Sequence, residues 1–306
     1  MKEIKNVLIC GIGAIGSIYA DIIQRFDDKS LRVLLDETRL KRYEENPIIF
    51  NGKELKFNYI LPSANDYKAD LIIIATKFEG LQDAITNIKN FVKDDTIIMS
   101  FLNGVTSEKI IAETYGAEKL LYSYFIGHSG VRVGRNVTHD GVNTIVFGSA
   151  NPIDKDNVQK VKQYFEKVGI NYKIPEDILY AMWLKYMLNV STNQTTAILG
   201  LNFGQVNSNP RCLDFVKEVM KEVQAIAKAE GIKNTENMIN DAMVSLSKMT
   251  PEGKTSMLQD VEAGRKTEVD MFAGVVIELG KKHNIPTPYN TVLKGLLDTI
   301  YSQHNL

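Results

Sequence analysis

The sequence predicts an α/β domain with a doubly wound parallel sheet over residues 1–175, followed by an all-helical domain over residues 176–306. In the first half, short apolar runs alternate with amphipathic helical patterns, as buried parallel strands and their crossover helices do. After Pro175 the strand-like runs stop, and helical patterns punctuated by glycine and proline take over. A chain of 306 residues is long enough for two hydrophobic cores.

The apolar runs expected to form strands of the sheet cover residues 4–10, 31–35, 70–76, 96–101 and 120–126. Helices are expected over residues 14–26, 80–91 and 107–115. Residues 131–137 and 144–147 are expected to form a hairpin, and a helix over 157–168 and a strand over 170–174 follow. In the second half, helices are expected over residues 177–199, 209–231, 235–248, 257–283 and 289–303.

Composition excludes several classes of function. The net charge of −1 gives no electrostatic reason to expect nucleic acid or a membrane as a partner. No apolar run approaches the roughly 18 residues of a membrane span. The two cysteines lie far apart in sequence and indicate no disulfide framework. Because disulfides are rare in the reducing cytoplasm, we expect a cytoplasmic protein. The four histidines form no cluster with ligand spacing, so no metal site is expected.

The most recognisable motif is a G-x-G-x-x-G run between an expected strand and an expected helix. It consists of Gly11, Ile12, Gly13, Ala14, Ile15 and Gly16. In a dinucleotide-binding unit the first glycine permits a tight turn, the second admits the pyrophosphate, and the third lets helix and strand pack closely. The helix N-terminus then attracts the phosphates. This context predicts a Rossmann-type domain that binds a nicotinamide dinucleotide.

The sequence is compatible with either NAD or NADP. Asp36 ends the second strand, where an acidic residue accepts hydrogen bonds from the adenosine ribose and disfavours a 2′-phosphate. Arg39 and Arg42 follow closely and are candidates to receive that phosphate, or simply belong to a solvated helix face.

An apolar helical pattern over residues 178–190 carries a polar stripe formed by Lys185, Asn189 and Asn193. The three residues are spaced four apart and share one helix face. Lys185 has no carboxylate three or four residues away, as a solvated surface stripe often has. A partly desolvated lysine has a lowered pKa and is a competent general acid. Asparagines suit a polar substrate with hydroxyl and carbonyl groups.

Further candidates lie in the helix expected over 257–283 and at two strand ends. Glu268 shares the apolar face of that helix with Val261 and Phe272. This position indicates either a carboxylate paired with a cation at the edge of the core, or a residue that lines the same cleft as Lys185, Asn189 and Asn193. Ser256 is a candidate helix cap or a hydrogen-bond donor that binds a carboxylate. Lys77 and Asn103 follow expected parallel strands, where open sheets bind ligands.

With these residues in place, the whole chain resembles the ketopantoate reductase (2-dehydropantoate 2-reductase) family. The resemblance rests on the glycine run at 11–16, Lys77, FLNG at 101–104, WLKYMLNVSTN at 183–193 and SMLQDVEAGRKTEVD at 256–270. It implies reduction of 2-dehydropantoate to pantoate in pantothenate biosynthesis, usually with NADPH. It also implies a keto acid as the small-molecule partner, and a homodimer.

The resemblance also implies roles for single residues. Lys185 matches the family's proton donor, and Glu268 a glutamate near the substrate hydroxyl and the nicotinamide ribose. Lys77 matches a lysine on the cofactor side, and Ser129 falls where the family's backbone passes the nicotinamide. Residues that match substrate-binding positions are Asn189, Asn193, Ser256 and Asn103, the last lying between cofactor and substrate.

Three features depart from the family pattern. Gly80 and Gln194 replace a common glutamine and a common proline, and the acidic pair Asp36-Glu37 is unusual for an NADPH enzyme. NAD(H) is therefore an alternative cofactor. An alternative function is that of a related short-chain 2-keto or hydroxyacid dehydrogenase, because a Lys-x-x-x-Asn pair also occurs in the 6-phosphogluconate and 3-hydroxyisobutyrate group. A further, less favoured alternative is a non-catalytic protein that senses nicotinamide cofactors. Such a protein would not need Lys185 and Glu268.

Overall fold

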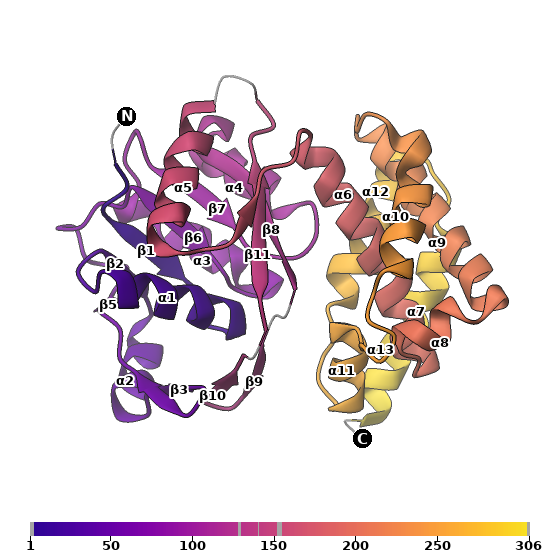
Figure 1. Cartoon of the computed structure of the whole chain (residues 1–306), viewed down its shortest axis with the longest axis horizontal. Coiled ribbons are helices and arrows are strands. Elements are labelled where there is room, and N and C mark those ends of the chain that lie inside the picture. Colours follow the sequence, from indigo (N-terminus) through magenta and orange to yellow (C-terminus); the bar gives the residue numbers. More distant parts are fainter. Residues whose placement is uncertain (1–2, 128–129, 140, 152–154, 305–306) are drawn as a thin grey trace. The chain divides into compact units, whose positions relative to one another are not determined.

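The computed structural model describes residues 3–127, 130–139, 141–151 and 155–304 (Figure 1). By its internal contacts the chain divides into two compact units, residues 1–178 and residues 179–306. The first contains parallel strands with helices, and the second is built from helices. The fold class predicted from the sequence is therefore confirmed.

The main sheet of the first unit has, among the described residues, eight strands in the order β12-β11-β8-β7-β6-β1-β2-β5. Their bounds are β1 Val7–Cys10, β2 Leu31–Leu34, β5 Tyr59–Ile60, β6 Leu71–Ile74, β7 Ile97–Ser100, β8 Leu120–Gly127, β11 Asn143–Gly148 and β12 Tyr172–Lys173. All neighbouring pairs are parallel except β8 and β11. The chain crosses from β2 to the other side of β1 to form β6, which creates the switch point where such sheets bind ligands.

A second sheet corrects one expectation. Its order is β4-β3-β10-β9, with bounds β3 Ile48–Phe50, β4 Lys53–Leu55, β9 Val131–Val133 and β10 Asn136–Thr138. The expected hairpin of residues 131–137 with 144–147 is wrong. Strand β10 pairs with β9 across a turn at Gly134, whose φ is +59°, whereas β11 pairs with β8. A left-handed glycine is the turn signal that redirects the chain here.

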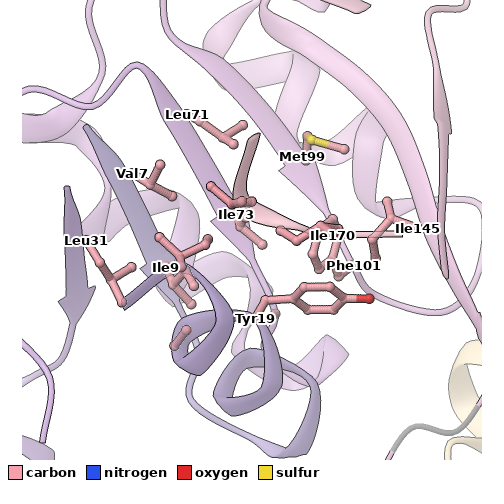
Figure 2. Close-up of a cluster of buried hydrophobic side chains, with 14 of the residues drawn as sticks. Val7, Ile9, Tyr19, Leu31, Leu71, Ile73, Met99, Phe101, Ile145 and Ile170 are labelled. Carbon is pink, nitrogen blue, oxygen red and sulfur yellow. The ribbon is translucent and has the colours of Figure 1, made fainter. Parts of the chain in front are cut away.

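In the described part of the first unit, five α-helices accompany these strands: α1 Ala14–Phe26, α2 Glu37–Glu45, α3 Leu81–Asn87, α4 Ser107–Tyr115 and α5 Lys155–Val168. Figure 2 shows the apolar side chains of β1, β6 and β7 gathered with Tyr19 of α1. The Tyr19 ring packs edge-on against Phe101, with the ring centroids 5.1 Å apart, and its hydroxyl donates to Asn143 Oδ1 at 3.1 Å. These two contacts of Tyr19 fix helix α1 on the sheet. They also fix the glycine turn that precedes the helix.

The second unit contains, in its described part, α6 Ile178–Leu188, α7 Gln194–Leu199, α8 Phe203–Asn207, α9 Pro210–Ala229, α10 Met238–Ser247, α11 Ser256–Glu262, α12 Val275–His283 and α13 Pro288–His304. Two π-helical segments interrupt this pattern, η5 over Asn189–Asn193 and η7 over Asp270–Gly274. A π-helical turn widens the helix by one residue and is frequent at functional sites.

The single helix expected over 257–283 is wrong, because the chain leaves the helix after Glu262. Gly264 adopts φ +63°, its N–H donates to the Val261 carbonyl, and the Arg265 N–H donates to the Asp260 carbonyl at 2.8 Å. This is a Schellman ending with glycine in the left-handed position. Glu268 therefore does not share a helix face with Val261.

Candidate active site

The carboxyl ends of four neighbouring strands collect the cofactor-side candidates of the first unit. Strands β2, β1, β6 and β7 lie side by side and run parallel. The residues that follow them are Asp36 after β2, the glycine turn 11–16 after β1, Lys77 after β6 and Asn103 after β7. The fold thus brings residues up to 92 positions apart to one edge of the sheet, at the switch point.

Each glycine of the turn answers to a different constraint. Gly11 has φ +100°, and a Cβ there would lie 2.6 Å from the Ala75 carbonyl carbon. At Gly16 a Cβ would lie 1.9 Å from the Gly11 carbonyl oxygen. At Gly13, the N-cap of α1, a Cβ would meet nothing within 4 Å, and no side chain caps the helix. Gly11 and Gly16 therefore serve packing. Gly13 leaves an open approach to the N-terminus of α1, which fits a pyrophosphate.

Arg132 on β9 is a residue that the sequence analysis missed. Its guanidinium donates to the carbonyl of Ile12 within the glycine turn and, at 2.9 Å, to the Tyr43 hydroxyl. Arg42 stacks over the same Tyr43 ring, with its guanidinium carbon 5.0 Å from the ring centroid. Two cations therefore flank the region between the glycine turn and α2. No sequence motif links Arg132 to residues 120 positions away.

Asp36 has a structural role beyond the one expected from the sequence. Its Oδ1 accepts from the Arg39 N–H at 2.7 Å and caps α2, the helix that contains Arg39 and Arg42. Its Oδ2 lies 3.4 Å from the Arg39 guanidinium. The carboxylate is thus engaged by its own helix, and a neighbouring positive charge offsets part of its negative charge.

The other cofactor-side candidates differ in exposure. Lys77 is exposed at the N-cap of a short 3₁₀ turn, residues 78–80, and Asn103 is half-buried. Ser129 lies outside the described residues, as does His128 before it.

A buried polar cluster lies next to the loop that carries Asn103. Ser100, the last residue of β7, hydrogen-bonds Ser107, the first residue of α4, with 2.8 Å between their hydroxyl oxygens. Ser107 also donates to Glu108 Oε2 at 2.9 Å. Burial raises the pKa of Glu108 from 4.5 to about 7. The Ser100–Ser107 hydrogen bond therefore joins the two ends of the loop over 101–106, and the Glu108 carboxyl group beside it is neutral in mildly acidic solution.

The raised pKa of Glu108 predicts a pH-dependent stability. Because the folded state holds this proton more tightly than the unfolded state, the free energy of unfolding falls as pH rises from about 4.5 to about 7. We expect Glu108→Gln, which is neutral throughout, to lose this decrease. Denaturant unfolding at pH 5 and pH 8 measures it. Equal decreases in the variant and the wild type would contradict the assignment to Glu108.

Lys185 lies in the last turn of α6, half-buried between apolar neighbours. Burial lowers its pKa from 10.5 to about 8, and the charge of Glu268 opposes the decrease. The opposing effect places the Glu268 carboxylate within electrostatic range of the Lys185 ammonium. Two of the sequence candidates, 83 residues apart, are therefore brought together within the second unit.

The backbone of this unit explains how they come together. Glu268 is half-buried just before the η7 segment, and its carbonyl accepts from the N–H groups of Met271 and Phe272. Tyr186, next to Lys185 and buried, donates its hydroxyl to the carbonyls of the same two residues at 3.1 and 2.8 Å. Residue 186 thus fastens the Lys185 helix to the segment that follows Glu268.

The asparagines and Ser256 lie on elements that pack together. Asn189 and Asn193 begin and end η5. Thr196 connects this segment to α11, because its hydroxyl donates to the Asn193 carbonyl at 3.0 Å and lies 2.7 Å from the Thr255 hydroxyl. Thr255, and not Ser256, caps α11, so the capping role considered for Ser256 is wrong. Ser256 is exposed beside the cap.

Other chemistries find little support in the described part of the chain. It contains no group of three or more histidine, cysteine or acidic side chains arranged to hold a metal ion. Burial raises the pKa of the Cys10 thiol to about 12, which makes it an unreactive apolar side chain. No described helix is long and apolar enough to cross a membrane.

A dinucleotide-binding edge in one unit and a lysine–carboxylate pair in a helical unit are features of an oxidoreductase that uses a nicotinamide cofactor. Family models agree with this class. Residues 7–152 match the ketopantoate reductase PanE/ApbA model, and residues 177–301 match the model of the C-terminal part of that family. The chain belongs to the ketopantoate reductase family, and the family predicted from the sequence is confirmed.

Individual proteins give the same picture. The chain is 27% identical to a 2-dehydropantoate 2-reductase of Streptococcus pyogenes serotype M6, over 95% of this chain and 96% of that protein. It is 28% identical to one from Pyrococcus horikoshii, with the same coverage. A solved D-mandelate dehydrogenase with NADH and anilino(oxo)acetate superimposes with a TM-score of 0.84 at 23% identity, covering 98% of this chain and 100% of that one. At that identity the likeness concerns the fold.

Proposed function

We propose that this protein reduces 2-dehydropantoate to pantoate with a reduced nicotinamide dinucleotide, and that Lys185 is the general acid. The observation that carries the proposal is the burial of Lys185 among apolar side chains in the last turn of α6, which lowers its pKa to about 8 against the opposing charge of Glu268. Such a lysine is still protonated at neutral pH but holds its proton less firmly than a solvated one, which suits an acid that works near pH 7. Membership of the family and the two relatives named 2-dehydropantoate 2-reductase support the choice of substrate.

The proposed mechanism divides the work between the residues. When bound, the dinucleotide would supply the hydride that reduces the keto carbon. Lys185 Nζ gives its proton to the keto oxygen as negative charge develops there, and it regains a proton from solvent after turnover. The Glu268 carboxylate favours the protonated form of Lys185. Asn189, Asn193 and Ser256 bind the carboxylate and hydroxyl groups of the substrate through amide and hydroxyl groups.

The cofactor would lie along the strand ends of the first unit. The turn 11–16 and the N-terminus of α1 would hold the pyrophosphate, and Lys77 and Asn103 lie farther along the same edge. We propose NADPH as the preferred dinucleotide. Asp36 is already engaged as a helix cap beside Arg39, and Arg42 and Arg132 add positive charge around Tyr43. A 2′-phosphate is a ligand for which arginine is well suited.

An Asp36→Asn variant tests the cofactor preference without disturbing the helix. Asparagine caps helices as well as aspartate does, so α2 keeps its cap while the negative charge is removed. We expect the ratio of kcat/KM for NADPH to that for NADH to rise about 5-fold, since unit charges a few Å apart in water repel by about 1 kcal/mol. An unchanged ratio, measured from initial rates with both cofactors, would remove Asp36 from cofactor selection.

A panel of keto acids tests the substrate. Initial rates with NADPH are compared for 2-dehydropantoate, for its analogue without the terminal hydroxyl, and for benzoylformate, the keto acid of mandelate. The proposal expects the highest kcat/KM for 2-dehydropantoate. Preference for an aromatic keto acid would instead favour a related hydroxyacid dehydrogenase. The expectations of a homodimer and of a cytoplasmic location stay predictions.

A further inference from the structure

A buried polar chain begins at Glu222 in α9. Its carboxylate accepts from the N–H groups of Tyr289 at 2.7 Å and Asn290 at 3.1 Å, which belong to the first turn of α13. A helix N-terminus has unpaired N–H groups and a positive dipole end, so a carboxylate from another helix is well placed there. Glu222 also accepts from the side-chain amide nitrogen of Asn290 at 2.7 Å.

This last bond sets the direction of the rest of the chain. Because the Asn290 amide nitrogen faces Glu222, its amide oxygen is available to accept from Gln194 Nε2 at 3.2 Å. The same Gln194 nitrogen donates to the Val190 carbonyl at 2.7 Å. Gln194 and Asn290 are both fully buried. Two acceptors therefore fix the orientation of the Gln194 amide.

The Val190 carbonyl belongs to η5, the segment that carries both asparagine candidates. In an α-helix this carbonyl would accept from the backbone N–H of residue 194, four residues on. In a π-helical turn the backbone pairing moves to the fifth residue. Here the side-chain amide of Gln194 donates to this carbonyl. The side chain thereby stabilises the wide turn from within.

The wide turn has a geometric consequence for the polar stripe. Along an α-helix, residues four apart drift by about 40°, so Asn193 would lie about 80° around the helix from Lys185. In a π-helix of about 4.4 residues per turn, four residues fall short of a full turn by about 30°. The η5 segment therefore offsets most of the drift that accumulates between Lys185 and Asn189. It returns Asn193 to the helix face that carries Lys185.

We propose that Gln194 is a positioning residue for the substrate site. Held by Glu222 through Asn290, it stabilises the π-helical turn that keeps Asn193 in line with Lys185. The proposal rests on the proposed function, because it treats Asn193 as a substrate-binding residue.

The test compares Gln194→Leu with Thr192→Val. Leucine keeps the size of the side chain and removes both hydrogen bonds. Thr192 is an equally buried residue of η5 whose hydroxyl has no partner in the described structure, so valine there removes a polar group but no bond. We expect Gln194→Leu to raise KM for 2-dehydropantoate about 10-fold or more. The Val190 carbonyl would be left unpaired, which disfavours the wide turn that aligns Asn193 with Lys185. KM for NADPH and all constants of Thr192→Val should stay within about 2-fold.

A second variant guards against a failure of Gln194→Leu to fold. In Gln194→Glu the new carboxyl donates a hydrogen bond only while protonated, so KM for the keto acid should fall as pH is lowered, relative to wild type. An unchanged KM in a folded Gln194→Leu protein, or an equal rise of KM in Thr192→Val, would overturn the positioning role of Gln194. In either case, wild-type reduction of 2-dehydropantoate would still uphold the proposed function. If the wild-type enzyme reduces no 2-keto acid, the proposed function and this inference both fail.

Discussion

Lys185→Ala is expected to lower kcat for keto-acid reduction by about 10²- to 10⁴-fold, the usual contribution of a general acid. The variant should fold and bind the dinucleotide as the wild type does, because Lys185 lies in the helical unit and the glycine turn in the other. Lys281, an exposed lysine of α12, offers a matched control, and Lys281→Ala should keep full activity. Single-turnover rates measure the effect. Turnover retained in Lys185→Ala would exclude Lys185 as the acid.

The lowered pKa of Lys185 adds a pH dependence to this prediction. Reduction needs the protonated lysine, so kcat/KM should fall as pH rises through about 8. In Lys185→Arg the guanidinium stays protonated above pH 12 and is too weak an acid. This variant should be as slow as the alanine variant and should lack the decrease above pH 8. A decrease at the same pH in Lys185→Arg would assign that ionisation to another group.

Gly13→Ala and Gly16→Ala are expected to fail in different ways. A methyl group at residue 13 meets nothing within 4 Å, so the free energy of unfolding should fall by no more than about 1 kcal/mol, the usual cost of alanine at a helix N-cap. The methyl group would nevertheless occupy the approach to the pyrophosphate. We expect Kd for NADPH to rise about 10-fold or more. Titration of NADPH fluorescence measures that Kd, and an unchanged value would mean that the turn does not hold the dinucleotide.

At residue 16 the same substitution should destabilise the fold itself. The new methyl carbon would lie 1.9 Å from the Gly11 carbonyl oxygen, a backbone atom that cannot move without displacing α1 from β1. We expect the free energy of unfolding to fall by about 3 kcal/mol, at the upper end for overpacked cores. Denaturant unfolding measures it. A Gly16→Ala protein of wild-type stability would contradict the packing role.

Much of the fold was predictable because local signals agree with the tertiary structure. The apolar run at Leu71–Ile74 is a fully buried parallel strand, and the strand–helix alternation reports the layered sheet. The errors occurred where one residue decides the path of the chain. Gly264 ends α11 inside an otherwise helical pattern, and Gly134 makes a turn that the sequence analysis placed further along. Both are glycines with positive φ, which hydrophobic periodicity does not detect.

The candidate site was predictable to the extent that its chemistry is local. The stripe of Lys185, Asn189 and Asn193 needs only helical spacing to be recognised. Gln194 was noticed only as a departure from a family pattern, since its partner Asn290 is 96 residues away. Arg132 was missed for the same reason. The sequence indicated that Asp36 binds the adenosine ribose, whereas in the structure its carboxylate caps helix α2. An acidic residue that follows a strand can therefore serve as a helix cap as well as a ligand-binding residue.

The most direct test of the account follows deuterium from NADPH labelled on the transferred position at C4 of the nicotinamide. The purified enzyme is mixed with the labelled cofactor and 2-dehydropantoate, and the product is analysed by mass spectrometry. The account predicts pantoate with one deuterium at C2, formed in a 1:1 ratio to the NADPH oxidised. Binding of NADPH without its oxidation, or pantoate without deuterium, would contradict it.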